Sequence, residues 1–208
     1  MKDKLKMRNV NAITVAICLA ATIMFSSCSK EDKTIPVSGV TMTMTTSKAS
    51  VWIDLQGSGT VTIYWGDGTS AITDTLSTTY WTDYIHSYSG SSTRTITIIG
   101  ENITGLDCGH NQLTTLDVSK NTALTELYCW YNQLTALDVS KNTALANLSC
   151  FNNQLTATAL NTLFGTLHGN TISGGKNIYI GGNSGTATCD RSIAENKGWT
   201  VDTTTTIN

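Results

Sequence analysis

Residues 106–126 read LDCGHNQLTTLDVSKNTALTE, and residues 127–147 read LYCWYNQLTALDVSKNTALAN. The two blocks are 21 residues long and agree at 15 positions. A third block begins at Leu148 and repeats the first part of the phrase before it diverges. Similarity at a fixed short interval is typical of a solenoid, in which coils stack and each coil contacts only its neighbours. The middle of the chain therefore predicts a stack of coils.

The spacing of apolar residues within the blocks indicates which kind of coil to expect. From Leu124 the chain follows the spacing LxxLxCxxNxL. This spacing resembles the leucine-rich repeat, which implies one strand in each coil and parallel strands about 4.8 Å apart. Residues 113–121 and 134–142 both follow LxxLxVxxN, so each coil is expected to present apolar side chains on two sides.

Stacking in register places equivalent residues in columns inside the coils. Because β-carbons one strand apart stand wider than the ~3.8 Å that a disulfide prefers, we expect reduced, buried thiols there. A zinc site is the rival interpretation, but cysteines in a line do not form a tetrahedron. Asparagine recurs at the same interval, and its side chain is expected to bond the backbone where the chain leaves each strand; these residues are Asn111, Asn132 and Asn153. The expected interior columns are one of leucines (Leu106, Leu127 and Leu148) and one of cysteines (Cys108, Cys129 and Cys150).

Period-two alternation places the residues between those columns on the outside of the coils. The outer positions vary between blocks and carry several aromatic rings, and exposed aromatic groups commonly mark binding sites. The alternative is that the flanking regions cover these rings, since small solenoids need caps. The expected ligand-binding residues are Tyr128, Trp130, Tyr131 and Phe151 as anchors, with His110, Glu126 and Asn152 as polar neighbours.

Alternating polar and apolar residues between positions 40 and 99 predict half-buried strands. Gly57-Ser58-Gly59 separates two of the apolar runs and is expected to form a hairpin turn. The YWGDG stretch at residues 64–68, with a final TITI strand, resembles the PKD-type immunoglobulin-like sandwich. That resemblance implies a core position for Trp65, and Asp67 is expected to bond its own backbone in a turn. A further aromatic group, Tyr80, Trp81 and Tyr84, is a secondary candidate for binding, and packing under its own loop is the favoured interpretation.

The residues after the repeat mix helix and strand patterns. Residues 158–167 carry four large apolar side chains on one face and predict a short helix. Residues 176–180 and 199–201 predict strands, and Asp190 is expected to cap a second helix between them. These elements are expected to close the open end of the stack.

The N-terminus has the pattern of a secretory signal. A basic start precedes a 16-residue apolar run, which is shorter than the roughly 20 residues that span a bilayer. FSSC at residues 25–28 resembles the lipobox of bacterial lipoproteins, which implies acylation of Cys28. SKED at residues 29–32 resembles the short signal that sends some of these lipoproteins to the outer face of the outer membrane. We therefore expect a lipid-anchored chain in the outer membrane, exposed on the cell surface.

The predicted fold is mainly β with some α. An N-terminal immunoglobulin-like β-sandwich is expected to pack onto a short leucine-rich-repeat solenoid with an α/β C-terminal cap. No linker separates the sandwich from the solenoid, so the last strand of the sandwich is expected to cap the first coil. The predicted segments are a lipoprotein signal peptide (1–27), the lipidated Cys28 with a tether (28–36), a PKD-like sandwich (37–101), leucine-rich repeats (102–157) and a capping unit (158–208).

Composition and motifs narrow the function. The chain has 13 basic and 15 acidic residues, which argues against nucleic acid as a partner, because such binders neutralise phosphates with basic side chains. The sequence has no recognisable catalytic triad, phosphate loop or metal-ligand cluster, so we expect no catalytic residues, no metal and no cofactor.

The family resemblance implies recognition or adhesion, because leucine-rich-repeat and PKD-like modules of bacterial surface lipoproteins generally serve that purpose. We therefore expect a cell-surface binding or adhesion lipoprotein whose partner is a protein or a glycan, held to the membrane through Cys28. The alternative is a non-catalytic structural or accessory subunit of an outer-membrane surface complex.

Overall fold

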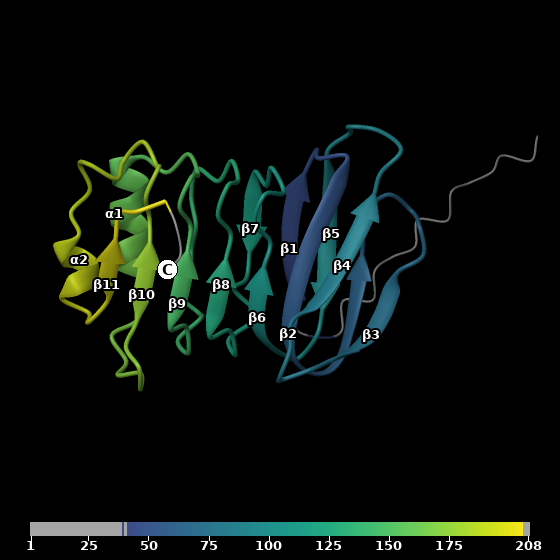
Figure 1. Cartoon of the computed structure of the whole chain (residues 1–208), viewed down its shortest axis with the longest axis horizontal. Helices are drawn as coiled ribbons and strands as arrows, with labels where there is room; N and C mark the ends of the chain where they lie inside the picture. The colour runs from purple at the N-terminus through teal and green to yellow at the C-terminus, as the bar shows by residue number, and fades with distance from the viewer. Residues whose placement is uncertain (1–38, 40, 206–208) are drawn as a thin grey trace, which may run out of the picture. The chain divides into compact units, whose positions relative to one another are not determined.

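The computed structural model describes residue 39 and residues 41–205. The expected signal peptide, Cys28 and the tether lie outside these residues. The described part is mainly β, as predicted, and neither of its helices is long and apolar enough to cross a membrane. In chain order the elements are β1 (Thr41–Thr46), β2 (Ser50–Tyr64), β3 (Ile72–Leu76), β4 (Thr82–Ser87), β5 (Arg94–Ile99), β6 (Asn102–Asp107), β7 (Thr115–Asp117), β8 (Glu126–Tyr128), β9 (Asn147–Ser149), α1 (Ala157–Thr166), β10 (Asn177–Tyr179), α2 (Ser192–Glu195) and β11 (Thr200–Asp202) (Figure 1).

Strand β2 belongs to two sheets. Its first part, up to Ser58, pairs with β4 and β6, and its second part, from Gly59, pairs with β3 and β5. The predicted hairpin turn at residues 57–59 is therefore wrong, because the strand continues through it. A β-carbon at Gly57 would collide with the carbonyl oxygen of Asn102, and Gly59 has a φ of +81°. The two glycines thus permit a bulge and a bend, which redirect the strand without reversing it.

The two sheets that share β2 face each other across an apolar core. One sheet has the order β3-β2-β5-β1-β7, and the other has the order β4-β2-β6-β8-β9-β10-β11. Along β1 and β2, buried residues alternate with partly exposed ones, as the period-two pattern predicts. The inward side chains of the antiparallel part, all at most 1% exposed, are Met42, Met44, Val51, Ile53, Leu55, Val61, Ile63, Trp65, Ile96 and Ile98.

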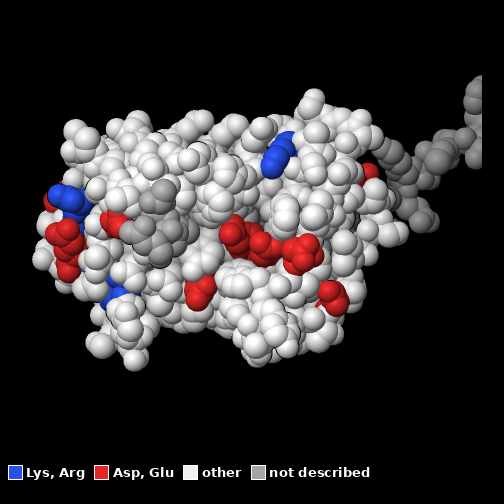
Figure 2. Space-filling model, viewed as in Figure 1, with Lys and Arg blue, Asp and Glu red and all other residues white. Residues whose placement is uncertain are grey.

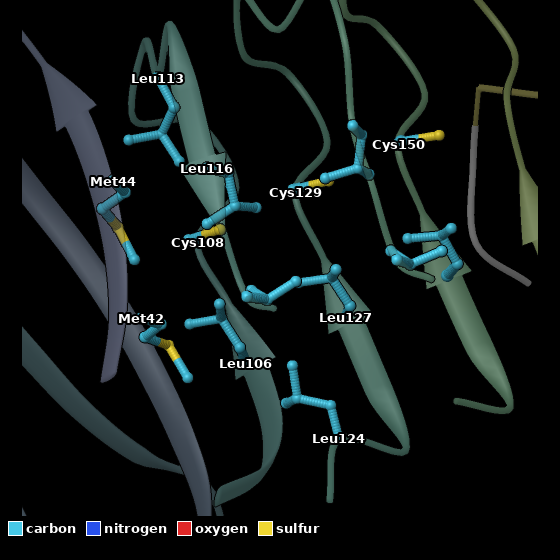
Figure 3. Close-up of a cluster of buried hydrophobic side chains, with 14 of the residues drawn as sticks. Met42, Met44, Leu106, Cys108, Leu113, Leu116, Leu124, Leu127, Cys129 and Cys150 are labelled. Carbon is cyan, nitrogen blue, oxygen red and sulfur yellow. The ribbon is translucent and has the colours of Figure 1, made fainter. Parts of the chain in front are cut away.

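The repeated blocks stack in register. Leu106 of β6 pairs with Leu127 of the parallel β8, and Leu127 pairs with Leu148 of β9. Figure 3 shows Leu106 and Leu127, together with the three cysteines of the repeat, pointing into the interior. The three cysteines of the repeat are buried and free, as expected, and burial raises the pKa of each thiol above its usual range.

The stack continues beyond the recognisable repeat. Ile178 of β10 pairs with Leu148, and Val201 of β11 pairs with Ile178, both in parallel. The interval from Leu148 to Ile178 is longer than 21 residues because α1 is inserted between β9 and β10, with its apolar face in the core. The C-terminal unit therefore extends the parallel sheet by two strands. Its predicted helix and strands are all present within two residues of their expected bounds.

Backbone hydrogen bonds join the antiparallel part to the first coil on both sides. Strand β2 pairs with β6 on one side, and β1 pairs with β7 on the other. The prediction that the last antiparallel strand caps the first coil is wrong, because β5 lies between β1 and β2. The short connection from Ile99 to Asn102 crosses from one sheet to the other. Strand β6 therefore pairs with the first part of β2, whereas β5 pairs with the second part.

Buried asparagines link each coil to the one before it. The side-chain oxygen of Asn132 accepts hydrogen bonds from the backbone N–H groups of Asn111 (3.0 Å) and Leu113 (2.9 Å). Its side-chain nitrogen donates to the carbonyl oxygens of Cys108 and Cys129, both at 3.0 Å. One carboxamide therefore satisfies four buried backbone groups on two neighbouring coils, as the sequence predicts for this position.

We call the column of Asn111, Asn132, Asn153 and Asn183 the asparagine ladder, and it extends beyond the repeat at both ends. Asn153 makes equivalent bonds one coil later, and Asn183 makes them after β10, to the carbonyl oxygens of Cys150 and Ile180. At the other end, the Asn111 side chain bonds the backbone N–H and carbonyl of Trp52. Strand β2 thus takes the place of a coil before the first repeat.

A second asparagine column, on the other side of the coils, is incompletely bonded. Asn142 donates to the carbonyl oxygens of Val118 and Asn121, at 3.0 and 2.8 Å. The side chain of Asn121 is buried, yet neither its nitrogen nor its oxygen has a hydrogen-bond partner. Its neighbour on this side is the antiparallel β1, which does not offer the backbone groups that a preceding coil would offer.

The two columns make a matched pair of stability predictions. Asn132→Ala should lower the free energy of unfolding by about 3 kcal/mol, because it leaves several buried backbone groups without partners. Asn121→Ala should lower it by less than about 1 kcal/mol, because it removes polar atoms that are already unpaired. Equilibrium unfolding in urea measures both values. Equal losses for the two variants would contradict the role assigned to the ladder.

Candidate functional site

The outer face of the parallel strands carries the side chains that the sequence analysis proposed for binding. Leu127 and Cys129 point inward and are fully buried. Glu126, Tyr128 and Trp130 alternate with them and are partly exposed on the outer face. The strands are held by the interior columns, so the outer side chains stand on a fixed backbone.

Four of the seven predicted residues form one cluster of rings. Trp130 stacks on Phe151, with ring centroids 5.5 Å apart and planes 17° apart. His110 stacks on Tyr131, with centroids 4.4 Å apart and planes 10° apart. Edge-to-face contacts join the two stacks, from Trp130 to His110 at 4.5 Å and from Tyr131 to Phe151 at 5.6 Å. We call His110, Trp130, Tyr131 and Phe151 the ring cluster.

The members of the ring cluster differ in exposure. Tyr131 is 46% exposed, His110 is also exposed, and Trp130 is half-buried. Phe151 is only 4% exposed, beneath the stacked Trp130 ring. The expectation that Phe151 is an exposed anchor is therefore wrong, because its ring supports the cluster from below. The surface that a partner can reach is made by His110, Trp130 and Tyr131.

The backbone under this cluster is in an unfavourable conformation. His110, Tyr131 and Asn152 occupy the same position in three successive coils, and their φ angles are +56°, +49° and +52°. The next coil has Gly182 there, with a φ of +68°. Asparagine and glycine tolerate this left-handed region, whereas a bulky residue such as Tyr131 loses about 1 kcal/mol in it. The first two coils thus keep rings where the later coils have residues that the backbone prefers.

Tyr128 and Glu126 belong to a second group on the same face. The Tyr128 hydroxyl donates to Glu126 Oε2 at 2.9 Å. The ring of Trp81, from the connection between β3 and β4, lies 5.9 Å from the Tyr128 ring. Trp81 sits over Gly105 of β6, where a β-carbon would stand 2.5 Å from the indole. A residue from the antiparallel part therefore covers one side of Tyr128, as the alternative interpretation expected for part of this face.

The loop that holds Trp81 does not keep its three aromatic residues together. Tyr84 is buried, Trp81 packs on the first coil, and Tyr80 is 69% exposed. The expectation that all three pack under their own loop is wrong for Tyr80 and Trp81. Gly105 was the available signal, because it replaces the Glu126 of the next coil and leaves room for a ring from elsewhere.

A glycine also makes room for Trp130. A β-carbon at Gly109 would stand 2.7 Å from the Trp130 ring, so the indole lies directly on the neighbouring backbone. The Trp130 indole nitrogen is buried and has no partner at hydrogen-bonding geometry. This nitrogen lies near the carboxylate of Asp107. Burial raises the pKa of Asp107, and the Trp130 N–H opposes that rise in part. Trp130 therefore connects the ring cluster to Asp107.

Three carboxylates form a row across the strands beside these rings. Asp83 of β4 is the cross-strand partner of Asp54 in β2, and Asp54 is the partner of Asp107 in β6. Figure 2 shows a row of acidic side chains in the middle of this face, with one basic side chain above the row and the other basic side chains at the left end of the view. We call Asp54, Asp83 and Asp107 the acidic row. This row could not be predicted from the sequence, because the pairing of β2 with β6 is not visible there.

Burial and mutual repulsion act on these carboxylates. Burial raises the pKa of Asp54, and the charge of Asp83 raises it further, while a 2.7 Å hydrogen bond from Trp52 Nε1 opposes the shift. Burial also raises the pKa of Asp107, with a contribution from Asp54 and an opposing 2.8 Å bond from the Gly109 backbone. Both groups therefore hold a proton more readily than an isolated aspartate does.

A separate pair of titratable groups lies in the antiparallel part. His86 Nε2 and Asp67 Oδ2 are 2.8 Å apart, and the His86 ring stacks on the buried Trp65 at 4.7 Å. Asp67 also accepts from the Thr69 backbone at 3.0 Å, so its predicted turn role is confirmed. Burial alone would raise the pKa of Asp67, but hydrogen bonds from Thr69 and His86 outweigh it and lower the pKa to about 2. This pair joins the turn to the core.

Residues 41–205 contain no group of three or more His, Cys, Asp or Glu side chains placed to hold a metal ion. Comparisons with protein-family models, with curated proteins and with solved structures found no match. The residues themselves therefore carry the functional argument.

The acidic row gives a stability prediction with a defined sign. The pKa of an aspartate in the unfolded chain is about 3.9. An aspartate whose pKa is higher in the folded chain stabilises the fold at pH values below about 3.9, and this stabilisation is lost as the pH rises through the folded-state pKa. The variant Asp54→Asn with Asp107→Asn should therefore be more stable than the wild-type chain at neutral pH, and its advantage should shrink as the pH falls toward 4. Urea unfolding at several pH values tests this.

The lowered pKa of Asp67 has the opposite sign and provides a control. Its stabilisation is present above the unfolded pKa of about 3.9 and is lost as the pH falls toward 2. The wild-type chain should lose free energy of unfolding as the pH falls from about 4 to 2, and Asp67→Asn should reduce this loss. Between neutral pH and 4, Asp67→Asn should leave the pH dependence of the free energy of unfolding unchanged. A constant stability difference between the Asp54/Asp107 variant and the wild-type chain over that upper range would refute the assignment to the acidic row.

Proposed function

We propose that this protein is a cell-surface binding or adhesion lipoprotein that recognises a protein or a glycan through the outer aromatic face of its coils. In this proposal residues 37–101 form a PKD-like immunoglobulin-like sandwich and residues 102–157 form leucine-rich repeats. The in-register pairing of Leu106, Leu127 and Leu148 supports the repeat assignment. The stack is a rigid support for side chains and has no assigned catalytic role.

The backbone conformation under the ring cluster is the observation that carries the proposal. Unfavourable left-handed residues persist where the rest of the structure compensates for them, and they concentrate at functional sites. Tyr131 is such a residue, whereas His110, Asn152 and Gly182 are residue types that tolerate the same position. We infer that the first two coils keep their rings for contact with a partner.

The proposed anchor is lipid on Cys28, which holds the chain at the outer face of the outer membrane. Nucleic acid is not a proposed partner. The proposed face consists of five residues, His110, Trp130, Tyr131, Tyr128 and Glu126, whereas a standard protein interface uses about 20–30 residues on each side. A single copy would therefore bind weakly, and many anchored copies would bind together through avidity.

Binding of residues 34–208, the compact unit that holds every described element, to glycan and protein panels tests the proposal. Tyr131→Asn removes the ring and keeps a residue that the backbone accepts, as Asn152 shows. It should abolish binding without loss of stability, and Trp130→Ala should also abolish binding. Tyr80→Ala, which removes an exposed ring outside the cluster, should leave binding unchanged.

The opposite results have defined meanings. Binding that survives both Tyr131→Asn and Trp130→Ala rejects the ring cluster as the recognition surface. Co-purification with an envelope protein, together with an absence of panel binding, favours the alternative of an accessory subunit in an outer-membrane complex. Surface biotinylation of cells that carry the full chain tests the proposed location, which a Cys28→Ala variant should lose.

A further inference from the structure

The acidic row ends beside aromatic rings on the same face. Asp107 is the cross-strand neighbour of Tyr128, and it is also next to Trp130 of the ring cluster. Asp54 accepts from the indole of Trp52, which is 54% exposed. Carboxylates and aromatic faces thus alternate over a short distance on β2, β6 and β8.

Within the described residues no lysine or arginine forms an ion pair with the carboxylates of the acidic row, and His110 is the nearby group whose charge lowers the pKa of Asp107. Among residues 41–205 the one ion pair joins His86 and Asp67, away from this row. Like charges directly opposite each other on neighbouring strands destabilise a sheet. Burial is the main cause of the raised pKa values of Asp54 and Asp107, and repulsion between the carboxylates adds to it. An arrangement that is unfavourable in the free protein becomes favourable when a partner supplies positive charge.

The chemistry of the face selects the kind of cation. The described residues have no ligand set for a metal ion, and a neutral sugar would leave the carboxylate repulsion in place. A guanidinium group binds two carboxylate oxygens in one plane and also stacks on aromatic faces. The cross-strand pair of Asp54 and Asp107, with the 54% exposed Trp52 beside it, offers both kinds of contact.

We propose that this face binds an arginine-bearing segment of a partner protein, with guanidinium groups on the acidic row and their flat faces against Trp52 and Tyr128. The inference rests on the proposed binding function and deepens it by naming the partner as a basic polypeptide. The acidic row provides the charge recognition, and the ring cluster provides the apolar contact beside it. Binding of this kind weakens with salt, because exposed charges are screened.

Peptide binding to the full-length chain in detergent tests the proposal. The probe is a glycine–serine peptide with arginine at alternate positions, and its control has the neutral citrulline in place of each arginine. The arginine peptide should bind, the citrulline peptide should not, and affinity should fall as sodium chloride is raised. The double variant Asp54→Asn with Asp107→Asn should weaken binding by at least about tenfold.

A double variant with the same change in charge serves as the matched control. Asp117 and Asp138 lie on the other side of the coils, where each accepts a hydrogen bond from a nearby serine N–H. Asp117→Asn with Asp138→Asn should therefore leave peptide binding unchanged. The midpoint of urea unfolding shows that both double variants fold, and the Asp54/Asp107 variant should unfold at the same or a higher urea concentration.

The possible results separate this inference from the proposed function. Equal binding of the arginine and citrulline peptides, or equal losses in the two double variants, overturns the inference. Glycan binding that is lost in Tyr131→Asn and kept in the Asp54/Asp107 variant, without arginine-peptide binding, overturns the inference and leaves the binding function in place. No binding of any peptide, glycan or panel protein overturns both.

Discussion

The stack depends on the hydrogen bonds of one buried carboxamide in each coil. A coil must turn away from its strand, and the turn leaves backbone N–H and carbonyl groups inside the molecule, where an unpaired group costs about 1–3 kcal/mol. Asn132 satisfies four such groups and ties two coils together. The same bonds from Asn111 to Trp52 extend this constraint to the antiparallel part. The two parts of the described chain are therefore joined by shared backbone hydrogen bonds.

This constraint explains why the outer face is free to differ between coils. Leucine, cysteine and asparagine columns hold the parallel strands β6, β8 and β9 in register, so the outer side chains of these strands have little influence on the fold. Gly105 and Gly109 use that freedom by leaving space for Trp81 and Trp130. His110 and Tyr131 use it differently, because the stack holds them in a left-handed conformation that they would otherwise avoid. On the face that we assign to recognition, the stacked coils thus override the backbone conformation that these residues would prefer.

The same face combines rings and uncompensated negative charge. Strand pairing places Asp54 between Asp83 and Asp107, although the three residues are far apart in the sequence. The ring cluster and the acidic row meet at Trp130 and Asp107. A partner that combines positive charge with a flat apolar surface would satisfy both features at once. The short stack limits the area of one contact, so a dense array of anchored copies would compensate for weak single contacts.

Much of the interior could be predicted from the sequence by itself. The 21-residue interval determines which residues stack, and period-two alternation determines which of them point inward, so the buried columns, the free thiols and the roles of Asn111, Asn132 and Asn153 followed from spacing. Alternation also placed Tyr128 and Trp130 on the outer face. Local patterns likewise indicated α1 and the C-terminal strands.

Only the tertiary structure decided what happens between distant segments. The bend of β2 through Gly57 and Gly59, the burial of Phe151 under a stacked ring and the acidic row all depend on pairing partners that the sequence does not name. The 21-residue interval predicts contacts between equivalent positions of the repeat, because residues that are 21 apart pair with each other on neighbouring strands. Contacts between a repeat and a region without that interval are set by packing and hydrogen bonding in three dimensions.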